Sequence, residues 1–146
     1  MSEEKIILHG RGATSGYGEG EALVIHGSMG GWGFADPVKG VFIDGHNKEC
    51  FGKSFAGKVL VFNNASGSSA WSMVYHNTRL NGVAPAAMVY NVTSAKAALG
   101  VVVGRIPAVT DLDRNPLELI DSGDYVRVDA DEGTVEILKK AEQTKT

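Results

Sequence analysis

The amino-acid sequence predicts a single α/β domain with a closed or semi-closed mixed β-sheet and a few short flanking helices. Residues 125–138 alternate apolar and polar side chains on both sides of a turn, which is typical of a β-hairpin. The middle of the chain alternates apolar runs with helical segments, which indicates strand–helix–strand units. No repeat or linker divides the 146 residues. We therefore treat residues 1–146 as one domain.

The first third of the chain is expected to be rich in β-structure. In order, we expect a strand at 5–10, a loop or bulged segment at 10–20, a strand at 21–26, a glycine-rich loop at 27–37 and a strand at 40–44. The chain holds 19 glycines, most of them before residue 70. They indicate either many tight turns or loops that approach a ligand or another chain closely.

The remaining elements follow from apolar runs and helix boundary signals. We expect a buried strand at 58–62, a helix at 69–81 ended by Asn81-Gly82, a strand at 86–90, a helix at 94–100 with a glycine stop, an apolar β-branched segment at 101–109, a short helix at 117–123 and the hairpin. Residues 141–146 are polar and are predicted to form a frayed tail.

Composition argues against several classes of partner. The formal net charge is −3, and Lys139-Lys140 is the only short basic run, which disfavours nucleic acid as a partner. No apolar run approaches the roughly 20 residues that a membrane-spanning helix needs. The first residues lack the apolar core of a signal peptide. We therefore expect a cytoplasmic location and no membrane association.

The sequence offers no metal site of its own. Cys50 is the single cysteine, and the four histidines are scattered along the chain. An internal disulfide is therefore impossible, and we expect no metal to be bound by this chain alone.

The most informative segment for chemistry is the turn Gly67-Ser68-Ser69, which follows a predicted buried strand and precedes a predicted helix. Such a turn directs backbone N–H groups and hydroxyls to one spot, which suits an anion or a reactive hydroxyl. The segment is not a Gly-x-Ser-x-Gly nucleophile elbow, which disfavours a serine hydrolase. From the residues alone, Ser69 is predicted to be the helix N-cap, and Ser68 a turn residue or anion contact.

The glycines at 10–20 resemble a dinucleotide-binding loop only superficially. That motif needs a helix after the glycines, whereas residues 21–26 are predicted to form a strand. Arg11 lies within this segment, and its guanidinium could contact a carboxylate or a partner chain. The alternative is an ordinary surface arginine.

A set of motifs along nearly the whole chain carries a family resemblance. In order, they are Gly10-Arg11-Gly12, Gly20-Glu21-Ala22-Leu23-Val24, Gly31-Trp32-Gly33-Phe34-Ala35-Asp36-Pro37, Gly40, His46, Gly57-Lys58-Val59-Leu60-Val61, Gly67-Ser68-Ser69, Gly82-x-Ala84-Pro85-Ala86-Ala87, Ile106-Pro107-x-Val109 and Ser122-Gly123-Asp124-x-Val126-x-Val128-Asp129. In this ordered set the chain resembles the small subunit, or swivel domain, of aconitase X in the aconitase superfamily.

The resemblance implies a fold, a reaction class and a partner. Aconitase X proteins are dehydratases (hydro-lyases) with a large catalytic part and a small swivelling β/β/α part, often on separate chains. The large part supplies the cysteines of an iron–sulfur cluster. We therefore expect this chain to be active only in a heterodimer with a large aconitase X subunit, which would carry the cluster. Its expected substrate is a small hydroxy acid.

The resemblance also implies roles for the serine turn. Members of the superfamily carry a Gly-Ser-Ser-Arg turn whose first serine removes a proton next to a carboxylate. By motif position the base is Ser68, and the expected substrate-binding residues are Ser66, Gly67, Ser69 and Arg11. Ala70 stands where the superfamily has a substrate-binding arginine, which disfavours a citrate-like substrate.

Three functions remain open at this point. The first choice is cis-3-hydroxy-L-proline dehydratase, with Ser68 as the base. The alternative is mevalonate 5-phosphate dehydratase, because the turn 66–69 could hold a phosphate. The third is a swivel or binding module that docks to a partner and carries no catalytic residue.

Overall fold

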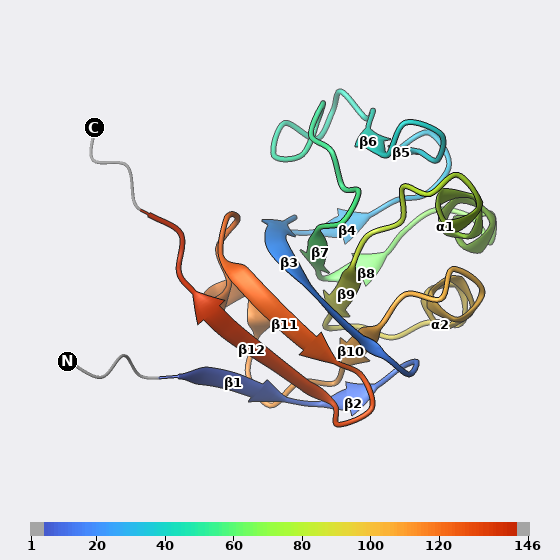
Figure 1. Cartoon of the computed structure of the whole chain (residues 1–146). Helices are drawn as coiled ribbons and strands as arrows, with labels where there is room; N and C mark the ends of the chain where they lie inside the picture. Colours follow the sequence, from blue (N-terminus) through green and yellow to red (C-terminus); the bar gives the residue numbers. More distant parts are fainter. Residues whose placement is uncertain (1–4, 143–146) are drawn as a thin grey trace.

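The computed structural model, which describes residues 5–142, contains an eight-stranded mixed sheet (Figure 1). The order of the strands is β1-β12-β11-β3-β7-β9-β10-β2. Their bounds are β1 (Ile6–His9), β2 (Arg11–Gly12), β3 (Tyr17–Val24), β7 (Val59–Phe62), β9 (Ala87–Tyr90), β10 (Ala108–Thr110), β11 (Tyr125–Asp129) and β12 (Thr134–Lys139). Neighbours from β3 to β10 pair in parallel, and the other pairs are antiparallel.

The two outermost strands of this order, β1 and β2, are consecutive in the sequence. Only Gly10 separates them, and its N–H donates to the carbonyl of Gly133 at 2.8 Å. The chain therefore passes directly from one end of the strand order to the other (Figure 1). This continuity closes the sheet into a barrel-like form. The predicted mixed α/β fold with a closed or semi-closed sheet is confirmed.

The central strands are buried on both faces, which explains their uninterrupted apolar sequences. Successive side chains of a strand point to opposite faces. Val59 and Val61 of β7 face an inner cluster enclosed by the sheet, whereas Leu60 and Phe62 face an outer cluster under the helices. The inner cluster consists of Leu8, Ala22, Val24, Val59, Val61, Ala87, Val89, Val109, Ile120, Val126, Val128, Ala130, Val135 and Ile137.

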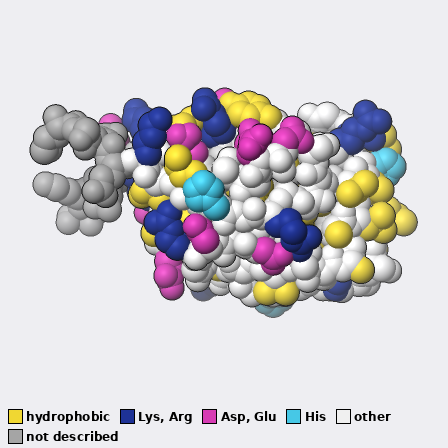
Figure 2. Space-filling model, turned by 90° about the horizontal axis from the view of Figure 1, so that it is seen from below, with side chains coloured by type: hydrophobic (Ala, Val, Ile, Leu, Met, Phe, Trp, Pro, Cys, Tyr) yellow, Lys and Arg dark blue, Asp and Glu magenta, His cyan; other side chains and the backbone are white. Residues whose placement is uncertain are grey.

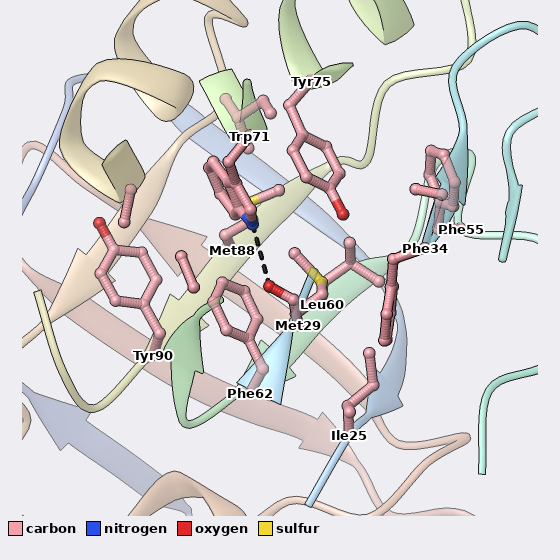
Figure 3. Close-up of a cluster of buried hydrophobic side chains, with 14 of the residues drawn as sticks. Ile25, Met29, Phe34, Phe55, Leu60, Phe62, Trp71, Tyr75, Met88 and Tyr90 are labelled. Atoms are coloured by element: carbon pink, nitrogen blue, oxygen red, sulfur yellow. Dashed lines mark hydrogen bonds between the residues drawn. The ribbon is translucent and has the colours of Figure 1, made fainter. Parts of the chain in front are cut away.

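Helices α1 (Trp71–Leu80) and α2 (Ala95–Val103) cover the outer face together, and α3 (Pro116–Leu119) is a single turn (Figure 1). The outer cluster is rich in aromatic side chains, namely Phe34, Phe42, Phe55, Phe62, Trp71, Tyr75 and Tyr90 (Figure 3). Trp71 of α1 packs against Phe62 of β7, with the ring centroids 6.4 Å apart. This aromatic packing fixes α1 against the sheet.

Two small strand pairs lie outside the main sheet. β4 (Ser28–Met29) pairs in parallel with β8 (Asn64–Ala65), and β5 (Ala35–Asp36) pairs antiparallel with β6 (Val41–Phe42). The glycine-rich loop predicted at 27–37 thus contains two short strands. Through β4 and β8 it is tied to the chain that leads into the serine turn.

The predicted strands at 5–10, 21–26, 58–62 and 86–90, the hairpin and the helix ending at Asn81-Gly82 are confirmed. The prediction of a loop or bulged segment through residues 10–20 is wrong near both ends, because β2 occupies Arg11–Gly12 and β3 begins at Tyr17. Gly18 of β3 lies so close to the backbone of Ala86 that a Cβ there would meet the Ala86 carbonyl oxygen at 2.1 Å. Glycine at this position allows a close backbone approach rather than a turn.

The helix predicted to stop at Gly100 continues to Val103. A Cβ at Gly100 would lie 2.3 Å from the ring of Trp71. This glycine therefore lets α1 and α2 approach each other closely and does not end the helix. The apolar β-branched segment predicted at 101–109 divides accordingly between α2 and β10.

The tail predicted at 141–146 lies partly outside the described residues, since the structure describes the chain to residue 142. Ala141 is held, because its N–H donates to a carboxylate oxygen of Asp124 at 2.7 Å. Within residues 5–142, no helix is long and apolar enough to cross a bilayer. On the face seen in Figure 2, the described part of the surface carries charges of both signs without an extended basic patch.

We predict that Gly18→Ala lowers the free energy of unfolding by about 1–3 kcal/mol, because the added methyl group overlaps the Ala86 carbonyl. Urea denaturation of both proteins measures this difference. Glu21→Ala in the same strand is the control, since Glu21 forms only an exposed ion pair with Lys58 and should change stability by less than about 1 kcal/mol. An unchanged or higher midpoint for Gly18→Ala would contradict the assigned packing.

Candidate functional site

The serine turn lies between β8 and α1, just beyond the carboxyl ends of the parallel strands. Ser66 is half-buried, whereas Gly67, Ser68 and Ser69 are exposed. Gly67 has φ +91°, a left-handed conformation that glycine adopts without strain. Sites of α/β sheets commonly form at this end of parallel strands.

Ser68, rather than Ser69, organises the start of α1. The Ser68 hydroxyl oxygen accepts a hydrogen bond from the N–H of Ala70 at 3.2 Å. The Ser68 carbonyl accepts from the N–H of Trp71 at 3.1 Å. The prediction that Ser69 is the N-cap is wrong, because Ala70 occupies that position and no side chain caps the helix. The N-cap therefore lies one residue later than predicted.

Three successive backbone N–H groups of the turn are free to bind a ligand. The amides of Gly67, Ser68 and Ser69 donate no hydrogen bond to any residue within 5–142. They lie beside the N-terminus of α1, where the helix dipole favours negative charge. The turn is therefore suited to an oxyanion such as a carboxylate or phosphate.

A pocket of about 340 Å³ opens at this turn. Its lining residues come from the glycine-rich loop and from the turn: Gly30, Gly31, Trp32, Gly33, Phe34, Asp44, Ser66, Gly67 and Ser68. The structure thus brings together three of the predicted site residues. Asp44 is the one titratable side chain in this lining, and its carboxylate accepts from the N–H of His46 at 3.0 Å. Nothing in the sequence pattern distinguished Asp44 from other strand-end aspartates.

Helix α1 holds the two sides of the pocket together (Figure 3). The carbonyl of Met29 accepts hydrogen bonds from the indole Nε1–H of Trp71 at 2.9 Å and from the N–H of Ser66 at 3.0 Å. The hydroxyl of Tyr75 donates to the carbonyl of Gly30 at 2.8 Å. These bonds fix the glycine-rich loop opposite the serine turn.

A lysine from α2 also reaches the turn. The Nζ of Lys96 donates to the carbonyl oxygen of Gly67 at 2.5 Å. Sequence reasoning missed Lys96, because a single lysine on a short predicted helix is indistinguishable from a surface residue. Its role depends on the packing of α2 beside α1, which only the structure shows.

Arg11 lies in β2, and its guanidinium is engaged by Asp111. Its Nε and Nη2 donate to one carboxylate oxygen of Asp111 at 2.9 and 2.6 Å. Arg11 is not among the residues that line the pocket at the serine turn. Its predicted role as a substrate contact stays a prediction.

The described residues do not fit an iron–sulfur cluster or another metal. Within 5–142, no three His, Cys, Asp or Glu side chains come together as a metal-binding group. Cys50 is buried, and this burial raises the pKa of its thiol to about 11. The ligands of iron–sulfur clusters are thiolates, whereas Cys50 stays protonated near neutral pH.

A larger surface hollow, of about 600 Å³, lies away from the serine turn. Its charged lining residues come from β3, β12 and neighbouring segments: Glu19, Glu21, Lys58, Lys139, Lys140 and Glu142. Two of its lysines are engaged in ion pairs, Lys58 with Glu21 at 3.3 Å and Lys140 with Asp121 and the buried Asp124 at 3.0 and 2.5 Å. We place the candidate site at the smaller pocket, which is lined by Ser66, Gly67 and Ser68 and lies beside the N-terminus of α1.

His26 anchors the start of the glycine-rich loop. Its backbone N–H donates to Glu49 at 2.6 Å, and its Nδ1 lies 2.5 Å from the other carboxylate oxygen of Glu49. Its Nε2 lies 3.3 Å from the carbonyl of Leu117. The hydrogen bond to Glu49 raises the pKa of His26 above its usual value, although partial burial opposes this.

Comparison with known proteins gives consistent relationships. A family model described as the aconitase X swivel domain matches residues 7–137. The chain is similar to the phosphomevalonate dehydratase small subunit of Methanosarcina acetivorans, with 36% identity over 92% of each chain. It is 39% identical to the protein of the same name from Archaeoglobus fulgidus, over 88% of this chain and 96% of that one.

Solved structures show the same relationship. The chain superimposes on the crystal structure of Thermococcus kodakaraensis aconitase X in its holo-form with a TM-score of 0.84 and 35% identity, covering 92% of this chain and 99% of that chain. A solution NMR structure of a UPF0107 protein matches with a TM-score of 0.83 and 36% identity, covering 92% and 100% of the two chains.

We predict that the pKa of the His26 ring lies above the usual value of a histidine, because the hydrogen bond to Glu49 stabilises the protonated ring. An NMR pH titration of the ring measures this pKa, and Glu49→Gln should lower the pKa of His26. Since the folded pKa is raised, the pair stabilises the fold below the unfolded pKa, and this contribution is lost as pH rises through the folded pKa. A His26 titration that Glu49→Gln leaves unchanged would contradict this pairing.

Proposed function

The chain belongs to the aconitase X swivel-domain family, and on this premise we propose that it acts with a large subunit to dehydrate 5-phosphomevalonate (mevalonate 5-phosphate). It is the small subunit of an aconitase-X-type dehydratase, a hydro-lyase. The proposed substrate is supported by the name that the relatives from Methanosarcina and Archaeoglobus share, since both are phosphomevalonate dehydratase small subunits. The predicted cytoplasmic location stays a prediction.

The substrate preference drawn from the sequence changes with these relatives. Sequence reasoning placed cis-3-hydroxy-L-proline first and mevalonate 5-phosphate second, and the relatives support the second better. The geometry agrees with an anionic substrate, because the amides of Gly67, Ser68 and Ser69 have no acceptor within residues 5–142 and lie beside a helix N-terminus. Ala70 replaces the arginine of citrate-like sites, which fits a substrate with another pattern of charge.

In the proposed reaction, Ser68 removes the proton from the carbon next to the substrate carboxylate. The electron pair of that C–H bond forms the new double bond, and the hydroxyl on the neighbouring carbon leaves as hydroxide, which takes up one proton to give water. Ser68 then releases the proton that it captured, which balances the proton consumed. A serine hydroxyl is a weak base, so its alkoxide needs stabilisation. The Ala70 N–H donated to the Ser68 hydroxyl oxygen and the N-terminus of α1 supply part of it.

The rest of the stabilisation requires the partner. Ser68 is exposed in this chain, and a closed cleft that excludes water strengthens every such interaction. We propose that the large subunit covers the pocket and carries the iron–sulfur cluster, for which the described residues offer no ligand set. A bound cluster would supply a Lewis acid for the departing hydroxyl.

The other predicted contacts differ in how well the geometry supports them. Ser66 and Gly67 line the pocket with Ser68, and the Ser69 amide is free to bind an anion. We propose these residues as substrate contacts. Arg11 has no comparable support, because its guanidinium is paired with Asp111 away from the pocket lining. The rival function, a binding module without a catalytic residue, predicts that Ser68 can be replaced without loss of turnover.

We predict that the complex of this chain with its large subunit dehydrates 5-phosphomevalonate and has at least 100-fold lower kcat/KM for cis-3-hydroxy-L-proline. Ser68→Ala should lower kcat by about 10²–10⁴-fold, the usual contribution of a general base. Steady-state assays of product formation from both substrates measure these values.

Ser72→Ala is the matched control, since its hydroxyl donates only to the carbonyl of Ser69 at 3.2 Å and does not line the pocket. A higher kcat/KM for cis-3-hydroxy-L-proline than for 5-phosphomevalonate would overturn the proposed substrate. Normal turnover by an intact Ser68→Ala complex would instead favour the binding module.

A further inference from the structure

The hydrogen bond from Lys96 to the serine turn has a consequence for the geometry of the site. The ammonium group of Lys96 donates to the Gly67 carbonyl at 2.5 Å. Lys96 is half-buried, and no carboxylate within residues 5–142 forms an ion pair with it. Its positive charge is therefore directed at the backbone of the turn rather than neutralised by an acidic side chain.

This hydrogen bond determines where the next N–H points. In a trans peptide, the C=O of Gly67 and the N–H of Ser68 belong to one planar unit and point in opposite directions. No cis peptide occurs within residues 5–142. With Lys96 on the carbonyl side, the Ser68 N–H is directed away from α2, and it has no acceptor among the described residues.

The same peptide could adopt the opposite orientation in the absence of Lys96. Gly67 has no side chain to hinder rotation, and a Cβ at this position would meet nothing within 4 Å. A flipped peptide would present the Gly67 carbonyl oxygen where the Ser68 N–H now lies. An oxygen at that point repels a bound anion, whereas an N–H attracts one.

We propose that Lys96 is a positioning residue, which holds the Gly67–Ser68 peptide so that the Ser68 N–H faces an oxyanion group of the substrate. This inference rests on the proposed function and deepens it. Lys96 touches the backbone of the turn and not the reacting atoms. It acts by keeping the amide and the hydroxyl of Ser68 oriented together.

The position of Lys96 is itself firmly determined. Ser94 caps α2, since its hydroxyl oxygen accepts from the N–H of Ala97 at 3.3 Å. Farther along α2, Gly100 lies against the ring of Trp71, which locks α2 to α1. The donor and the turn that it holds are therefore attached to two helices in fixed contact, and the lysine side chain spans between them.

NMR of the 146-residue chain tests the orientation without depending on turnover, and a related protein has been solved by NMR in solution. We expect inorganic phosphate to shift the Ser68 amide resonance in the original chain and in Lys96→Arg, which keeps a cationic donor, but not in Lys96→Met. The ¹³C resonance of the Gly67 carbonyl should also move in Lys96→Met without ligand. A parallel titration with acetate distinguishes phosphate recognition from carboxylate recognition.

In the complex with the large subunit, Lys96→Met should lower kcat/KM by about 10–100-fold, the range for a misplaced catalytic group. Lys96→Arg should retain most of the original kcat/KM. Lys58→Met, which removes a lysine distant from the turn, should leave kcat/KM unchanged. A Ser68 amide unresponsive to both anions in the original chain, or equally responsive in Lys96→Met, would overturn the inference. A different substrate would overturn only the proposed function, because the NMR result does not depend on it.

Discussion

The arrangement of the site depends on the carbonyl of Met29. It accepts one hydrogen bond from the indole of Trp71 and one from the backbone of Ser66, at 2.9 and 3.0 Å. A single oxygen thereby joins the glycine-rich loop, the strand that leads to the serine turn, and the first residue of α1. Trp71 is 1% exposed, so its N–H has no water to replace this acceptor, and loss of the bond would leave a buried donor unsatisfied.

This constraint connects the closed sheet to the chemistry. The sheet buries β7 on both faces, which fixes where β8 and the turn emerge, and the aromatic cluster fixes α1 above them. The amides of Gly67, Ser68 and Ser69 then have no acceptor within residues 5–142, while Lys96 of α2 donates to the Gly67 carbonyl. In the function that we propose, the chain provides the hydroxyl of Ser68 and an anion site. The large subunit would provide the dry cleft and the cluster.

Much of this organisation could be predicted from the sequence, and the failures have physical causes. Uninterrupted apolar runs and the hairpin alternation located the strands, because burial on one or both faces dictates those patterns. Glycine misled in β3 and α2, since Gly18 and Gly100 allow close contacts that involve distant residues, Ala86 and Trp71. Asp44 and Lys96 reach the site only through tertiary packing, so no local pattern marked them. Local capping rules wrongly favoured Ser69 as the N-cap, whereas the choice of Ser68 as the base rests on motif order and stays a proposal.

The central claim is that Ser68 removes the substrate proton, and isotope exchange tests it most directly. The intact complex is incubated in D₂O with 5-phosphomevalonate, and deuterium at the carbon next to the carboxylate of the remaining substrate is followed by NMR. We expect the original complex to incorporate deuterium, and a Ser68→Ala complex that still binds substrate to incorporate none above the uncatalysed rate. Undiminished exchange in Ser68→Ala would assign the base to another residue and contradict the account.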